Sequence, residues 1–251
     1  MSLSTIYIGG FVGVLLSGAF LYIEIGNFAT PQVPRTLFDE RREIFSYTLG
    51  LFAGIPLAFF LLLLETSMTG GYFLSVVFEL VVFVGLTELA QWLLMRSAYF
   101  GGGDERPFYA LGFRAGISAI LILAVVEAAT GIPGVSPEVL ALAAAQSLAL
   151  LFISIAGALV STRTGPGGGR PRGGPLPGAA FGTLGIILVA FGWFFGPYVG
   201  IAAAGLAIAG SLVVYLRLRA AILLRMRPPP APRESMGASG PPPPRYGRVN
   251  E

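Results

Sequence analysis

The stretch FYALGFRAGISAILILAVVEAA, residues 108–129, holds one arginine and one glutamate in 22 otherwise largely apolar residues. At a rise of about 1.5 Å per residue, a helix of this length matches the ~30 Å hydrocarbon layer of a bilayer. Six further apolar runs cover residues 5–25, 44–64, 72–95, 138–160, 179–195 and 198–220. The sequence therefore predicts an all-α, polytopic helical membrane protein, with seven transmembrane helices in one bundle over residues 1–227.

The composition excludes the two main alternative fold classes. Hydrophobic residues make up 55% of the chain and charged residues 12%, whereas a soluble domain carries about 25% charged residues. The apolar runs are long and continuous, whereas an outer-membrane barrel is built from short segments that alternate in hydrophobicity. Neither a folded soluble domain nor a barrel is expected.

The distribution of arginine predicts the orientation. All 16 basic residues are arginines, and they lie in or beside the first, third and fifth gaps between the apolar runs and in the C-terminal tail. Cytoplasmic loops of membrane proteins are enriched in arginine and lysine. We therefore expect the N-terminus outside, the C-terminus in the cytoplasm, and a location in the cell (plasma) membrane. Residues 228–251 contain two proline runs and are predicted to form a disordered, Pro-rich cytoplasmic tail.

The net charge of +3 follows from these basic loops. Arginines at helix ends are expected to contact anionic lipid head groups. The residues predicted to do so are Arg41, Arg42, Arg217, Arg219, Arg225 and Arg227. No basic surface is large enough for nucleic acid. A protein partner would bind through helix faces or through the Pro-rich tail.

Two short glycine motifs predict close helix packing. Gly50 and Gly54 lie one turn apart in the second apolar run, as do Gly112 and Gly116 in the fourth, and such small-residue faces let helices approach closely in lipid. We favour packing inside the bundle over dimerisation. Residues 47–55 and 109–117 agree at six of nine positions, which indicates either a duplicated two-helix unit or the coincidence expected among residues common in membrane helices.

One proline is expected to disturb a helix. Pro56 lies inside the second apolar run, where it removes a backbone hydrogen-bond donor and should kink or locally unwind the helix.

The absent residue types exclude several chemistries. Without histidine or cysteine there is no Ser-His-Asp triad, no His/Cys zinc site and no common haem ligand. Without lysine there is no retinal Schiff base and no phosphate-binding P-loop. We therefore expect no cofactor, no metal and no enzymatic activity. The only two aspartates, Asp39 and Asp104, lie in cytoplasmic loops.

Four polar side chains inside the runs are the candidate site: Glu79, Glu88, Gln91 and Arg114. Glu88 and Arg114 lie at a similar depth, roughly 10 Å from the ends of two helices joined by one loop. This predicts an intramembrane ion pair, with Gln91 one turn below Glu88. Glu79 is nine residues from Glu88 and therefore lies on the opposite face of its helix. The pair is either a structural link or part of a gate or proton relay.

These features favour a non-enzymatic scaffold or accessory subunit of a membrane complex. The first alternative is a small transporter or proton-coupled channel that uses Glu79, Glu88 and Arg114. The second is a lipid-acting enzyme that uses the loop carboxylates Asp39 and Asp104.

Overall fold

The computed structural model describes residues 3–28, 39–68, 73–100, 106–130, 135–162 and 175–226. These residues form helices, as the sequence predicts. The elements are α1 (Leu3–Phe28), α2 (Glu40–Met68), α3 (Phe73–Arg96), a short 3-10 turn (Ala98–Phe100), α4 (Arg106–Thr130), α5 (Pro137–Ser161), α6 (Pro175–Phe195) and α7 (Pro197–Met226). Six of the helices are long and apolar enough to cross a membrane, and α6 contributes a shorter apolar stretch, Pro175–Ala190. The predicted tail, 228–251, lies outside the described residues.

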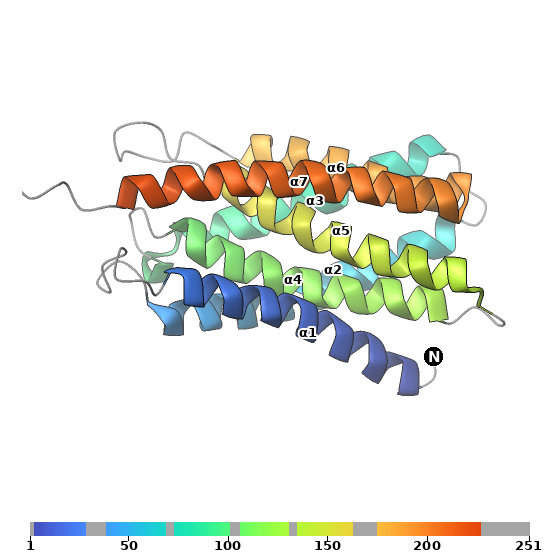
Figure 1. Ribbon diagram of the computed structural model, residues 1–251, viewed down its shortest axis with the longest axis horizontal. Helices are drawn as coiled ribbons and strands as arrows, with labels where there is room; N and C mark the ends of the chain where they lie inside the picture. The colour runs from blue at the N-terminus through green and yellow to red at the C-terminus, as the bar shows by residue number, and fades with distance from the viewer. Residues whose placement is uncertain are drawn as a thin grey trace, which may run out of the picture.

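The helices run side by side, with α4 in the middle of the bundle (Figure 1). Helices α1, α2 and α5 pack directly on α4, while α6 and α7 pack on α5 and on each other. Within the apolar spans, 78% of α4 is buried but only 28% of α1 and of α2. The outer helices instead expose large apolar side chains, among them Phe11, Phe52, Phe59, Phe78 and Leu206. An apolar exterior of this kind suits contact with lipid.

The two predicted glycine faces meet each other. A Cβ atom on Gly116 of α4 would lie 2.7 Å from the amide nitrogen of Leu51 and 2.9 Å from the carbonyl carbon of Gly50, both in α2. A Cβ on Gly54 would lie 2.9 Å from the side chain of Ile120. Only glycine allows backbones to approach so closely. These motifs therefore serve packing inside the bundle.

Helices α2 and α4 are parallel, because the contacts advance together along both. Ser46 donates a hydrogen bond of 2.5 Å to the carbonyl oxygen of Tyr109, and Gly54, two turns later, faces Ile120. The similar segments 47–55 and 109–117 thus pack against each other. A duplicated two-helix unit would place the two segments in this parallel arrangement. The duplication itself stays a prediction.

Two details of α2 concern Pro56 and the start of the helix. The helix runs without a break through Pro56, and the kink or local unwinding expected there stays a prediction. Asp39 precedes the helix, and its Oδ1 accepts a hydrogen bond of 2.9 Å from the backbone amide of Arg41. This contact satisfies one of the free amides at the helix start.

We predict that Gly116→Ala destabilises the bundle by about 1–3 kcal/mol, because its methyl group would push α2 away from α4. The free energy of unfolding in an SDS titration of the purified protein measures this effect. Gly85→Ala is the matched control, since a Cβ at Gly85 of α3 would meet nothing within 4 Å. That variant should be as stable as the wild type or more stable. Equal stability of Gly116→Ala and Gly85→Ala would contradict the packing role.

Candidate functional site

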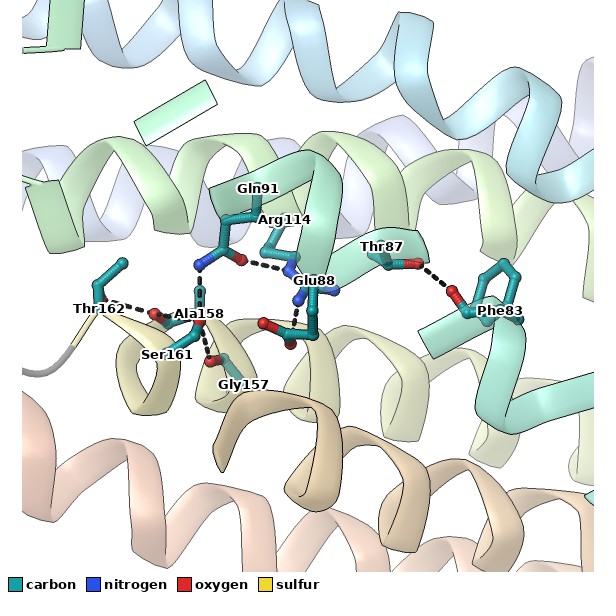
Figure 2. A network of polar contacts seen from close by, with 9 residues as sticks. All are labelled: Phe83, Thr87, Glu88, Gln91, Arg114, Gly157, Ala158, Ser161 and Thr162. Carbon is teal, nitrogen blue, oxygen red and sulfur yellow. Dashed lines mark hydrogen bonds and ion pairs between the residues drawn. The ribbon is translucent and has the colours of Figure 1, made fainter. Parts of the chain in front are cut away.

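Glu88, Gln91 and Arg114 lie together inside the bundle (Figure 2). The Arg114 guanidinium donates through Nη2 to Oε1 of Glu88 and through Nε to Oε1 of Gln91. Only 2% of Glu88, 1% of Gln91 and 5% of Arg114 is exposed. Because residues three apart share one side of a helix, Glu88 and Gln91 of α3 both face Arg114 of α4. The ion pair is therefore fully enclosed.

The network continues into α5. The amide Nε2 of Gln91 donates to the hydroxyl of Ser161 at 2.7 Å. That hydroxyl in turn donates to the carbonyl oxygen of Gly157 at 2.8 Å. The side chain of Gln91 thus links α3 to α4 through Arg114 and to α5 through Ser161. These two hydrogen bonds fix the register of the three helices.

Two glycines make room for the Glu88 carboxylate. A Cβ atom on Gly157 of α5 would lie 3.6 Å from Oε1, and one on Gly178 of α6 would lie 2.6 Å from Oε2. The backbones of α5 and α6 thus approach the carboxylate directly. Among the described residues, none donates a hydrogen bond to Oε2. Glu88 and Arg114 therefore form a buried pair whose charges cancel. The Oε2 atom of Glu88 can still accept a proton or a hydrogen bond.

Glu79 does not join this network. It lies nine residues before Glu88 on α3, which is half a turn around the helix and about 13 Å along it. Its side chain is half-buried. Glu79 and Glu88 therefore do not form one dicarboxylate site. The lipid-acting enzyme alternative would use Asp39 and Asp104. The structure does not test whether these two carboxylates meet, because Asp104 lies outside the described residues.

The arginines predicted at the lipid surface differ in their surroundings. Arg41 and Arg217 are exposed. Arg42 pairs with Asp39 at 3.4 Å in an exposed contact. Arg219 is half-buried, and its Nε lies 3.4 Å from Oε2 of Glu24, so it is more than a head-group contact. The side chain of Arg225 and all of Arg227 lie outside the description.

Sequence reasoning missed two buried carboxylates, Glu24 and Glu43, which are 3% and 0% exposed. Glu24 lies at the end of the first predicted span, and Glu43 stands one residue before the second. Each resembles an ordinary interfacial residue. A signal was available for Glu43, which lies seven residues before Gly50 and thus on the same side of α2, the side that packs on α4.

Comparison of the chain with protein-family models, with curated proteins and with solved structures gave no match.

We predict that Arg114→Met lowers the free energy of unfolding by about 3–5 kcal/mol, because it leaves the Glu88 carboxylate buried without its partner. The double variant Glu88→Met/Arg114→Met should recover most of this loss, since both charges are then gone. SDS titration of the two single variants and the double variant gives the coupling energy. Strictly additive losses would show that the two side chains do not stabilise each other.

Proposed function

We propose that the protein is a non-enzymatic integral membrane subunit, a scaffold or accessory component of a membrane complex. The observation that supports this proposal most is the enclosure of Glu88 and Arg114. Their charges neutralise each other, and the helices around them are held close by Gly157 and Gly178. A pair placed in this way fixes the relative positions of α3, α4, α5 and α6. A rigid bundle that presents constant outer faces is what a scaffold requires.

The outer helices supply the proposed contact surfaces. Large apolar side chains project from α1, α2 and α7, including Phe11, Phe52 and Leu206. In a bilayer such faces contact either lipid or a partner helix. We propose that a partner binds there, with the proline-rich segment 228–251 as a second, cytoplasmic contact. The cytoplasmic arginines would hold the bundle against anionic lipid.

We further propose seven spans in the plasma membrane, with the N-terminus outside and the C-terminus in the cytoplasm. The seventh span requires α6 to cross. Its 21 residues reach about 32 Å at 1.5 Å per residue, which is close to the hydrocarbon thickness. The alternating arginine pattern supports the same topology.

A proton-coupled transporter is the second candidate. It is favoured by one observation, the Glu88 oxygen Oε2 that no described residue supplies with a hydrogen bond. A relay would use this oxygen, with Arg114 adjusting the charge beside it. The two candidates differ in whether removing the charge of Glu88 abolishes a measurable flux.

We expect the protein to be recovered from its native membrane in mild detergent with a protein partner in fixed stoichiometry. Phe52→Ser, on the exposed face of α2, should weaken this recovery if that face binds the partner, whereas Glu40→Ser in the first turn of the same helix should not. Proton flux into liposomes that contain the purified protein tests the transporter alternative.

A flux that Glu88→Gln abolishes, together with a monodisperse protein that carries no partner, would reject the scaffold proposal in favour of the transporter.

We expect Ser2→Cys to react with a membrane-impermeant thiol reagent in intact cells, and Ser239→Cys to react only after lysis. The natural chain has no cysteine, so each variant carries a single label site. If both sites react in intact cells, or neither does, the number of spans is even and α6 does not cross.

A further inference from the structure

A second set of buried carboxylates lies where α1 ends and α2 begins. Glu24 of α1 accepts a hydrogen bond from the hydroxyl of Tyr215 in α7. Its other oxygen lies 3.4 Å from Nε of Arg219, one turn later in the same helix. Glu43 of α2 is completely buried nearby, against α4. We refer to Glu24, Glu43, Tyr215 and Arg219 as the Glu24–Glu43 cluster.

The side chain of Glu43 packs against the backbone of α4 and has negatively charged neighbours. A Cβ atom on Gly112 of α4 would lie 2.9 Å from the Glu43 carbonyl oxygen and 3.3 Å from its Cγ, so α4 covers this side chain directly. Both carboxylate oxygens are buried, and no described residue donates a hydrogen bond to either. Of the residues in the described ranges, Glu24 of α1 and Glu40 of α2 are the charged groups that act on it, and both are negative.

Glu43 differs from the other buried carboxylates in having no oppositely charged partner among the described residues. Three carboxylates are buried in the described part of the chain: Glu24, Glu43 and Glu88. Arg114 pairs with Glu88, and Arg219 pairs with Glu24. A buried charge without a partner is strongly unfavourable, so in proteins it is paired, ligated or neutralised. Counting only the residues that the structure describes, the cluster is one positive charge short.

The chemistry of the cluster favours a singly charged ligand. Divalent ions such as Ca²⁺ take six or more oxygen ligands, several of them carboxylates. Over the described ranges, no group of three or more acidic, histidine or cysteine side chains could surround a metal ion. One monovalent ion balances the single unpaired carboxylate without leaving an excess of charge.

We propose that Glu43 is the binding site for one monovalent cation, a proton or an alkali-metal ion, held where α1, α2 and α4 meet. The bound charge neutralises the carboxylate that no arginine in the described part of the chain pairs with. Because α4 and α2 enclose the site and Glu24 of α1 contributes to its field, occupancy stabilises the closed arrangement of these three helices. The site is separate from the Glu88–Arg114 pair and does not depend on the scaffold function.

A ligand that binds only the folded state raises the thermal midpoint of unfolding. The test uses the full-length protein in detergent, with tryptophan fluorescence to follow unfolding. Sodium chloride is titrated against N-methylglucamine chloride at constant ionic strength and pH. In parallel, infrared spectra record the carbonyl stretch of protonated carboxyl groups at neutral pH. If the ligand is an alkali ion, we expect a saturable, sodium-specific rise in Tm. If it is a proton, we expect a protonated-carboxyl band instead.

Glu43→Gln should abolish whichever signal the wild type shows, because the amide keeps the shape of the side chain but cannot ionise. Glu138→Gln is the control, since it makes the same change in the first turn of α5, a helix outside the Glu24–Glu43 cluster, and should leave the signal intact. The proposal is overturned if the wild type shows neither signal, or if the signal survives in Glu43→Gln.

A second variant keeps the proposal testable if Glu43→Gln fails to fold. Glu24→Gln releases Arg219 from its partner and removes one negative charge from the field at Glu43. We expect the apparent affinity for the cation to fall about tenfold or more, as the loss of a favourable charge interaction of about 1.4 kcal/mol gives. An unchanged titration in Glu24→Gln would also overturn the proposal.

Discussion

A polar group that enters the hydrocarbon layer has no water to bond with, so its partner must come from the protein itself. This constraint acts most strongly on Arg114, whose guanidinium lies inside the most deeply buried helix of the bundle. Glu88 supplies the opposite charge, and Gln91 carries the contact on to Ser161. The positions of α3 and α5 around α4 are therefore tied to one side chain.

The same constraint explains why glycine recurs at the contacts of α4. Helices in lipid gain little from burying apolar surface, so they are held by close packing and hydrogen bonds. Gly50 and Gly116 bring the backbones of α2 and α4 into contact, and Ser46 then reaches the carbonyl oxygen of Tyr109. Around Glu88, glycine has a different use, because Gly178 leaves space for a carboxylate rather than for a backbone.

The helices and the partners of Arg114 were accessible from sequence because they depend on local spacing. Apolar runs give the span length directly, and one loop joins the helices that carry Glu88 and Arg114. The Glu24 contacts were not accessible. Tyr215 is separated from Glu24 by 191 residues, and nothing in the local pattern pairs the first helix with the last. Glu43 was missed for a related reason, since its burial depends on Gly112 of α4 covering it.

The two buried clusters differ in their charge balance. At Glu88 the charges cancel, and breaking that pair costs far more than forming it contributes, so the pair acts mainly as a specification of helix register. At Glu43 the charges do not cancel within the described residues. In our proposal this imbalance is met by a positive charge from outside, so that the stability of the fold depends on the surrounding solution. In the two proposals, the first cluster holds the bundle in one arrangement, whereas the second makes the end where α1 and α2 meet responsive to its ionic environment.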